Sequence, residues 1–292
     1  MKTIGFIGLG VMGNSMAGHL LDAGYQLHVY TRTAAKAKPL VDRGARWCSA
    51  VAECAAGADA VITMVGFPKD VEEVYFGPRG IIENAKKGAV LIDMTTTDPA
   101  LAVRIHGEAA KRGLLALDAP VSGGDVGAKN AALSIMAGGD RAGFDLAMPL
   151  FEKLGKTIVY TGPAGSGQHT KMANQIAICG AISGVCEAIT YARANGLDVD
   201  NMISCISGGA AGSWQLNNMA ARMQRNDYAP GFFIKHQTKD LRLAKKSAQA
   251  AGVELPVLQA VSAMYDALEQ EGKGELGTQA LIKYYEEHTT KA

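Results

Sequence analysis

The first part of the chain alternates short apolar runs with segments of helical periodicity as far as about Gly162. We expect strands at Thr3–Ile7, Gln26–Tyr30, Ala60–Val65, Val90–Met94, Leu114–Leu117, Ser134–Ala137 and Thr157–Tyr160. We expect the helices between them to include Gly13–Ala23, Ala34–Arg43, Asp70–Phe76, Pro99–Arg112 and Ala142–Leu154. Strands that are apolar throughout and joined by helices form a mostly parallel sheet covered on both faces. The pattern therefore predicts an α/β domain.

Beyond this point the strand-like runs disappear and helical spacing takes over. A long helix is predicted over Gly167–Ala194, and further helices over Val199–Ile206, Trp214–Met223, Thr238–Ala251 and Pro256–Gln270. We therefore expect two domains, an α/β domain over residues 1–163 and an all-α domain over residues 164–292, linked by the long helix.

Composition excludes several classes of function. The formal net charge is +1 and charged residues make up 20% of the chain, so there is no general field for nucleic acid or membrane surfaces. No secretory signal and no apolar run long enough to span a bilayer are recognised, and we expect a cytoplasmic protein. The five cysteines include no Cys-x-x-Cys pair and the six histidines are scattered, so no metal site is expected.

A glycine pattern lies between the first expected strand and the first expected helix. It reads Gly8-Leu9-Gly10-Val11-Met12-Gly13. Glycines at this spacing allow a tight turn, a close approach of the backbone to a pyrophosphate, and close packing of helix on strand. The sequence thus predicts a Rossmann-like domain that binds NAD or NADP through these six residues.

The end of the second expected strand bears on which of these cofactors binds. An acidic residue is expected there when the ribose 2′-hydroxyl of NAD is recognised, but the sequence reads Thr31-Arg32-Thr33. A guanidinium can pair with a 2′-phosphate, and the two threonines can add hydroxyl contacts. We therefore favour NADP over NAD. The alternative is that Arg32 is simply a solvated side chain at the end of a strand.

Other expected strand ends offer further ligand contacts, because ligands of such sheets bind outside the carboxyl ends of the strands. Val65, Gly66 and Thr96 are candidates for the cofactor, although local turn capping accounts for a threonine equally well. Ser122-Gly123-Gly124 offers a hydroxyl and open backbone N–H groups, which suit a carboxylate. A plain loop is the alternative for this segment.

Lys171 follows a glycine-rich approach, Gly165-Ser-Gly167, and is expected in the first turn of the long helix. Asn174 and Gln175 lie three and four residues further, so the three side chains share one face, which we expect to differ from the apolar stripe. A lysine in a cleft can act as a general acid or base, whereas most helix lysines are merely solvated. Phe232 is a candidate apolar wall for a substrate. Lys239, at the start of an expected helix, can reach a cofactor or substrate.

Taken together, Gly8–Gly13, Asp118–Gly124, Gly165–Gln175 and Lys239–Ala244 resemble the β-hydroxyacid dehydrogenase family over essentially the whole chain. The resemblance implies NAD(P)-dependent interconversion of a short hydroxyacid and its semialdehyde or oxo acid, such as 3-hydroxyisobutyrate, tartronate semialdehyde, glyoxylate or succinic semialdehyde. It implies that Lys171 is the catalytic lysine, that Ser122, Gly123 and Gly124 bind the substrate carboxylate, and that Thr96 and Lys239 contact the cofactor. It also implies homodimers or homotetramers.

The resemblance leaves some choices open. Either Asn174 or Gln175 can be the amide that contacts the substrate. Imine reductases share a similar scaffold but commonly lack the lysine, and 6-phosphogluconate dehydrogenases are longer. A non-catalytic NADP sensor is a candidate from a different class.

Overall fold

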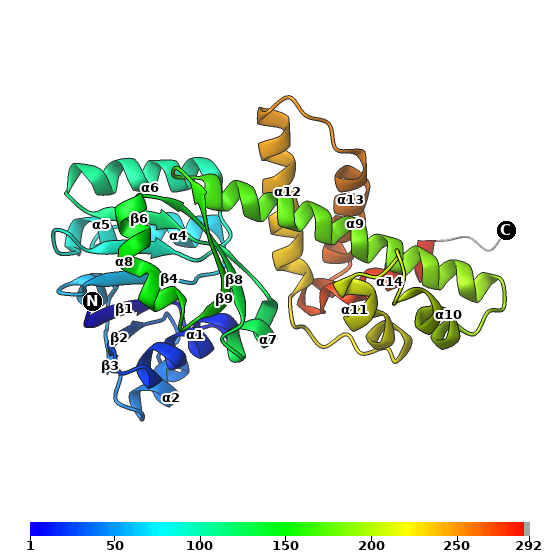
Figure 1. Ribbon diagram of the computed structural model, residues 1–292, viewed down its shortest axis with the longest axis horizontal. Coiled ribbons are helices and arrows are strands. Elements are labelled where there is room, and N and C mark those ends of the chain that lie inside the picture. Colours follow the sequence, from blue (N-terminus) through cyan, green and yellow to red (C-terminus); the bar gives the residue numbers. More distant parts are fainter. Residues whose placement is uncertain (289–292) are drawn as a thin grey trace. The chain divides into compact units, whose positions relative to one another are not determined.

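We describe residues 1–288 of the protein from a computed structural model (Figure 1). They form two compact units, a sheet unit over Met1–Lys171 and a helical unit that begins at Met172. The boundary lies inside the long helix α9 (Ser166–Ala194), whereas the boundary predicted from the sequence, after residue 163, lies just before this helix. The first turns of α9 therefore belong to one unit and the rest to the other.

The sheet unit contains a nine-stranded sheet in the order β3-β2-β1-β4-β5-β6-β8-β7, with β9 paired to β8. The neighbours from β3 to β6 run parallel, while β8 is antiparallel to β6 and β7. The strands are β1 (Thr3–Ile7), β2 (Gln26–Tyr30), β3 (Arg46–Trp47), β4 (Ala60–Thr63), β5 (Val90–Asp93), β6 (Leu115–Asp118), β7 (Val121–Ser122), β8 (Leu133–Gly139) and β9 (Gly155–Gly162). The prediction of a mostly parallel Rossmann-like sheet is confirmed.

Helices cover both faces of this sheet, because neighbouring residues of one strand enter two different hydrophobic clusters. Phe6 and Ile62 belong to a cluster with residues of α1 and α8, whereas Ile7 and Val61 pack with residues of α3 to α6. The helices are α1 (Val11–Asp22), α2 (Lys38–Val41), α3 (Val51–Ala55), α4 (Pro68–Phe76), α5 (Ile81–Asn84), α6 (Pro99–Lys111), α7 (Gly124–Lys129) and α8 (Arg141–Phe151). The short elements β3, β7, α3, α5 and α7 were not predicted.

The helical unit is built on the rest of α9 and on α10 (Val199–Ile206), α11 (Trp214–Gln224), α12 (Ile234–Ala250), α13 (Pro256–Gln270) and α14 (Leu281–His288). The expectation that no apolar run is long enough to cross a bilayer was wrong. Helix α9 has 29 residues and contains an 18-residue segment of mean hydropathy 1.3, so by length and composition alone it could cross a membrane. Its apolar side chains also form part of a protein core. Cys179, Cys186 and Ile189 are fully buried in the core of the helical unit.

Acidic side chains are buried where β5 and β6 end. Asp93 and Asp118 are opposite each other in the register of these strands. Asp93 accepts hydrogen bonds at Oδ1 from Thr63 Oγ1 (2.7 Å) and from the backbone N–H of Thr95 (3.1 Å), while its Oδ2 is buried without a hydrogen-bond partner among the described residues. Burial, aided by the charge of Asp118, raises the pKa of Asp93 to about 6.

This environment predicts that Asp93→Asn stabilises the protein at high pH. Because the folded-state pKa is raised, the wild type binds more protons when folded, and its free energy of unfolding falls as pH rises from about 4 through about 6. The neutral variant lacks this loss, so we expect it to be more stable by about 1 to 3 kcal/mol at pH 8 and nearly equal at pH 4. Urea unfolding at the two pH values measures the difference.

Asp59 provides a control of opposite sign. Its carboxylate pairs with Lys86 and accepts the backbone N–H of Thr3 (3.0 Å), and the lysine holds the pKa of Asp59 below its usual range. Asp59→Asn should therefore lower stability at pH 8, with a smaller effect as pH falls. A loss of stability in Asp93→Asn at pH 8 would contradict the interpretation of Asp93.

Candidate active site

The loop between β1 and α1 contains glycines of two kinds. Gly8 has φ +100°, and a Cβ there would lie 2.2 Å from the carbonyl oxygen of Met64. A Cβ on Gly13 would lie 2.0 Å from the carbonyl oxygen of Gly8. A Cβ on Gly10 would meet no atom within 4 Å. The fold itself requires Gly8 and Gly13, whereas no neighbouring atom requires glycine at position 10, and the absent side chain leaves space for a ligand to approach the backbone.

The start of α1 fits an anionic ligand. Gly10 is the N-cap, so no side chain caps the first N–H groups, and the first turn has no acidic residue. Val11 is exposed, Met12 is half-buried and Leu9 is buried in the core below. Open N–H groups at a helix N-terminus attract phosphate groups. The residues from Gly8 to Gly13 are therefore suited to hold the pyrophosphate of a dinucleotide.

Arg32 follows β2, and its side chain is 73% exposed. Its Nη1 donates to Asp70 Oδ1 (3.0 Å), and Asp70 also accepts the backbone N–H of Phe67 at Oδ2 (3.0 Å). Asp70 lies in the first turn of α4, so Arg32 is tethered at one nitrogen while its guanidinium remains accessible. The neighbours Thr31 and Thr33 are half-buried and exposed. The role of Asp70 was missed, because 38 residues separate it from Arg32.

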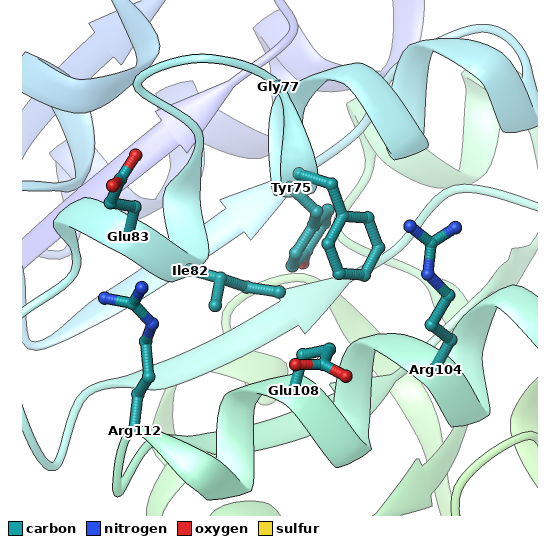
Figure 2. Close-up of a pocket in the computed structure, with 8 residues that line it drawn as sticks. Tyr75, Gly77, Ile82, Glu83, Arg104, Glu108 and Arg112 are labelled. Carbon is teal, nitrogen blue, oxygen red and sulfur yellow. The ribbon is translucent and has the colours of Figure 1, made fainter.

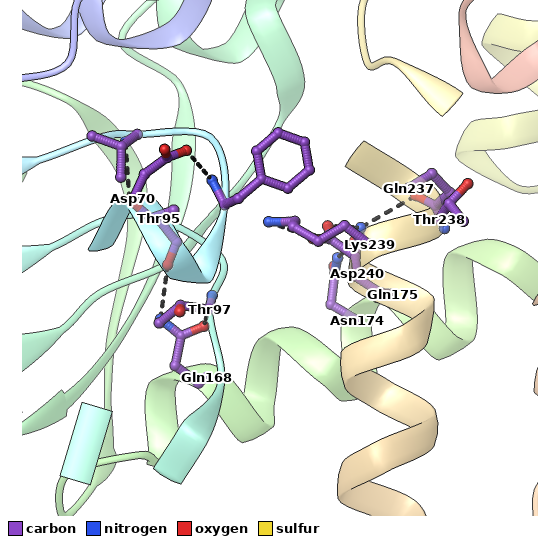
Figure 3. A network of polar contacts seen from close by, with 12 residues as sticks. Asp70, Thr95, Thr97, Gln168, Asn174, Gln175, Gln237, Thr238, Lys239 and Asp240 are labelled. Atoms are coloured by element: carbon purple, nitrogen blue, oxygen red, sulfur yellow. Dashed lines mark hydrogen bonds and ion pairs between the residues drawn. The ribbon is translucent and has the colours of Figure 1, made fainter. Parts of the chain in front are cut away.

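The loop that follows β5 is bound to a side chain from α9. Gln168 is fully buried, and its amide accepts from the backbone N–H of Thr97 (2.9 Å) and donates to the carbonyl of Thr95 (2.8 Å), as Figure 3 shows. Thr95 Oγ1 in turn accepts the N–H of Val65 (3.0 Å), next to the half-buried Gly66. Thr96 lies half-buried between the two bonded residues. Gln168 was not predicted as a site residue, and the only signal in the sequence was its position one helical turn before Lys171.

The segment predicted to bind a carboxylate is a strand end that leads directly into a helix. Ser122 is the last residue of β7, and Gly124 is the first residue of α7. Gly123 and Gly124 have φ values of +129° and +62°, which favour glycine. A plain loop was the alternative for this segment, and α7 was not predicted. The hydroxyl and two glycine N–H groups thus stand at a fixed turn.

Lys171 is the last residue of the sheet unit and the sixth residue of α9. It is therefore in the second turn of the helix and not in the first turn as predicted, because the helix begins at Ser166, one residue before the predicted start. Lys171 is 6% exposed. This burial argues against the alternative of an ordinary solvated helix lysine.

The amides that follow belong to the helical unit, and Gln175 is 2% exposed. The expectation that their face differs from the apolar stripe was wrong for Gln175, which lies one turn before the buried Cys179. Gln175 Nε2 donates to Asp240 Oδ2 (2.7 Å) and to Gln237 Oε1 (3.3 Å), and its Oε1 accepts from Asn174 Nδ2 (2.8 Å), as Figure 3 shows. The buried Asp240 and Gln237 were not predicted.

Helix α12 carries the other predicted residues of this unit. It begins at Ile234, so Lys239 is in its second turn and not at its start as predicted. Lys239 Nζ lies 3.0 Å from Asp240 Oδ1, and the side chains are 12% and 1% exposed. Phe232 is half-buried just before the helix, with its ring centroid 6.1 Å from that of His236. Both residues therefore sit close to the start of one helix.

A separate pocket of about 460 Å³ lies on the sheet unit, among α4, α5 and α6 (Figure 2). Arg104 and Arg112 line it together with Glu83 and Glu108, and Arg104 lies over the ring of Phe76 (4.1 Å to the centroid). None of the predicted site residues lines this pocket.

Comparison with known families matches almost the whole chain. The family described as "NAD binding domain of 6-phosphogluconate dehydrogenase" matches residues 3–162. The family described as "NAD-binding of NADP-dependent 3-hydroxyisobutyrate dehydrogenase" matches residues 165–285. The two matches meet close to the start of α9.

Individual proteins are similar over the full length. An uncharacterized oxidoreductase of Bacillus subtilis (strain 168) is 52% identical, covering 97% of this chain and 99% of that protein. The 2-hydroxy-3-oxopropionate reductase of Escherichia coli (strain K12) is 38% identical, covering 97% of each. The solved structure of Mycobacterium tuberculosis 3-hydroxyisobutyrate dehydrogenase with L-serine has a TM-score of 0.89 at 30% identity, covering 97% of this chain and 98% of that one.

A reductive aminase is more distant. The reductive aminase from Aspergillus terreus in complex with NADPH has a TM-score of 0.62 at 22% identity, and covers 97% of this chain and 99% of that one. This likeness shows a common fold only.

The two kinds of glycine predict different outcomes for one type of substitution. Gly10→Ala should fold with an unchanged melting temperature and bind NADPH at least about tenfold more weakly, because a methyl group fills the space left for the pyrophosphate. Gly13→Ala should destabilise the protein itself, because its Cβ meets backbone. Thermal melts without cofactor, together with NADPH titration by fluorescence, separate the two effects. Equal NADPH affinity in Gly10→Ala and the wild type would contradict the assignment of this loop.

Proposed function

Because the chain belongs to the β-hydroxyacid dehydrogenase family, we propose that it interconverts a short hydroxyacid and its semialdehyde or oxo acid, with NADP as the preferred cofactor. Membership indicates an NAD(P)-dependent hydroxyacid dehydrogenase, and the relatives leave the substrate undetermined. The observation that carries the proposal is the buried Lys171 in the same unit as the glycine loop and Ser122–Gly124. The candidate substrates are 3-hydroxyisobutyrate, tartronate semialdehyde, glyoxylate and succinic semialdehyde.

Four groups of residues hold the reactants. The N–H groups from Gly8 to Gly13 hold the pyrophosphate, and Arg32 with Thr31 and Thr33 receives the 2′-phosphate of the adenosine ribose. Val65, Gly66, Thr96 and Lys239 are proposed to line the rest of the cofactor site. The substrate carboxylate is bound by the Ser122 hydroxyl and by the N–H groups of Gly123 and Gly124. When bound, the nicotinamide supplies or takes up the hydride.

Lys171 handles the proton. In the reducing direction its ammonium donates a proton to the oxygen of the substrate carbonyl as negative charge develops there, and in the oxidising direction the neutral amine removes the hydroxyl proton. Such a transfer typically contributes about 10²- to 10⁴-fold to the rate. Asn174 is proposed as the amide that orients the substrate, and Phe232 as part of an apolar wall.

We also propose a homo-oligomer of this chain. The helical unit exposes large apolar side chains, among them Tyr191, Leu197 and Trp214 at 67%, 50% and 58%. Packing against a second copy of the chain would remove these side chains from water, which favours association.

Lys171→Met tests the reaction and its acid. The thioether side chain keeps the length and apolar bulk of the lysine but transfers no proton. We expect the turnover number to fall by about 10²- to 10⁴-fold while the affinity for NADPH stays unchanged. The measurement is NADPH oxidation with glyoxylate, succinic semialdehyde, methylmalonate semialdehyde and tartronate semialdehyde, alongside NADPH titration. Full turnover in the variant would refute the role of Lys171, and a wild type that binds NADPH without reducing any aldehyde would favour an imine substrate or a sensor.

Arg32→Ala tests the cofactor preference. Loss of a charged contact to the 2′-phosphate should lower the ratio of kcat/KM for NADPH over NADH by about 10- to 100-fold, as expected for a charged hydrogen bond of about 1.5–3 kcal/mol. Arg141→Ala is a matched control, since Arg141 is 65% exposed and pairs with Asp145 (2.9 Å) in the first turns of α8. A preference for NADH in the wild type, or an unchanged ratio in Arg32→Ala, would overturn NADP recognition by this arginine.

A further inference from the structure

The first turn of α9 is capped by a residue from a distant strand. Gly165 precedes the helix and has no side chain, and the first turn contains no acidic residue. Asp118, the last residue of β6, accepts the backbone N–H of Gly165 at Oδ1 (2.8 Å) and that of Gln168 at Oδ2 (2.8 Å). Its carboxylate thus satisfies two helix-end donors and places a negative charge where the helix favours one. The sequence separations are 47 and 50 residues, so this cap fixes α9 to the sheet.

A second attachment comes from the helix itself. The Gln168 amide pairs with the backbone of Thr95 and Thr97 on both its donor and its acceptor side, as a neighbouring strand would. The side chain is fully buried, so water cannot replace these bonds. The loop after β5, which contains Thr96, is therefore bound to the same turn of α9 that Asp118 caps.

The packing around this turn allows little movement. A Cβ on Gly167 would lie 2.3 Å from the carbonyl oxygen of Asp118 and 2.4 Å from that of Met136 in β8. A Cβ on Gly138 would lie 2.7 Å from the backbone nitrogen of Gly167. The backbone of α9 thus touches the sheet directly on two strands.

We propose that Asp118 and Gln168 are positioning residues that hold Lys171 in the sheet unit, in fixed register with Thr96 and the Ser122–Gly124 turn. Lys171 is three residues after Gln168 and therefore on the same side of the helix. One turn later, Gln175 is bonded to α12 within the helical unit. The hydrogen bonds of α9 therefore change from one unit to the other between Gln168 and Gln175. Asp118 and Gln168, which we call the clamp, hold Lys171, the proposed general acid, in the unit that contains Gly8–Gly13. This inference rests on the proposed role of Lys171.

Two substitutions remove the clamp from its two sides. Asp118→Asn replaces one acceptor oxygen by an N–H group that faces another N–H, and Gln168→Leu removes both hydrogen bonds of the amide at similar volume. A displacement of about 1 Å can cost about 10²-fold in rate, so we expect the turnover number to fall by about 10- to 100-fold. The KM for NADPH should change by less than about threefold, because the glycine loop is untouched. Gln168→Glu keeps the acceptor for Thr97 and should give an intermediate loss if the leucine variant does not fold.

Asp140→Asn is the matched control. Asp140 directly precedes α8 in the same unit, accepts the backbone N–H of Ala116 (2.9 Å) and lies 3.2 Å from His106. The variant should lower the melting temperature as the clamp variants do, but leave the turnover number near that of the wild type when all are assayed well below melting.

The assay uses NADPH and the fastest aldehyde of the panel, and its outcomes are distinct. Wild-type turnover in both Asp118→Asn and Gln168→Leu, with Lys171→Met inactive, overturns the clamp and leaves the proposed function intact. Full turnover in Lys171→Met overturns the proposed function as well. A rise in the KM for NADPH as large as the fall in turnover would show that the clamp supports the cofactor loop instead, and would also overturn the proposal.

Discussion

The parallel register of β1, β4, β5 and β6 determines where the proposed functional groups of the sheet unit lie. Thr63, Asp93 and Asp118 are neighbours across three strands, so the loops that follow these strands begin side by side. The glycine loop follows β1, which pairs with β4. The backbone groups that leave this edge need new partners, because buried N–H and C=O groups are rarely left unpaired. Here the partners are side chains: Asp93 bonds to Thr95, Asp118 to Gly165 and Gln168, and Gln168 to Thr95 and Thr97.

A large part of the fold could be predicted from periodicity. The bounds of β1, β2, α10 and α13 were predicted to the residue. The two strands are short and mostly apolar, Asp198 directly precedes α10, and proline is the first residue of α13. Most of the elements that were missed are short, although α14, with eight residues, was missed as well. Strands β3 and β7 have two residues each and α3 has five, too few for a period to appear. The start of α12 was predicted at Thr238, four residues after its actual start at Ile234. The residue before the helix is Phe233, whose side chain cannot cap the helix, so the sequence does not mark this start.

The candidate site could be proposed from the sequence as a set of residues but not as a set of contacts. Gly8–Gly13, Ser122–Gly124 and Lys171 can be found because their residue types and their places next to expected strands and helices are typical of ligand sites. Asp70, Gln168, Gln237 and Asp240 were missed because each of them acts on residues far along the chain. Gly10 and Gly13 show the same limit, since both match the glycine pattern of the sequence. Only the structure reveals that Gly13 is required by backbone packing, whereas Gly10 leaves open space beside the loop.

The hydrogen bonds that link Asn174, Gln175 and Asp240 have a defined donor and acceptor direction. This direction bears on which of the two amides is available to a substrate. A carboxylate only accepts hydrogen bonds, so Asp240 obliges Gln175 to present its NH₂ group to it. That NH₂ group also donates to Gln237, and Gln175 Oε1 must then face Asn174, whose NH₂ group donates to it. All polar atoms of Gln175 are thus engaged within the unit, whereas Asn174 is half-buried with its carbonyl oxygen turned away from this bond. An acceptor oriented in this way suits the hydroxyl of a hydroxyacid. The hydrogen bonds of Asp240 therefore favour the proposal that Asn174, and not Gln175, is the amide that contacts the substrate.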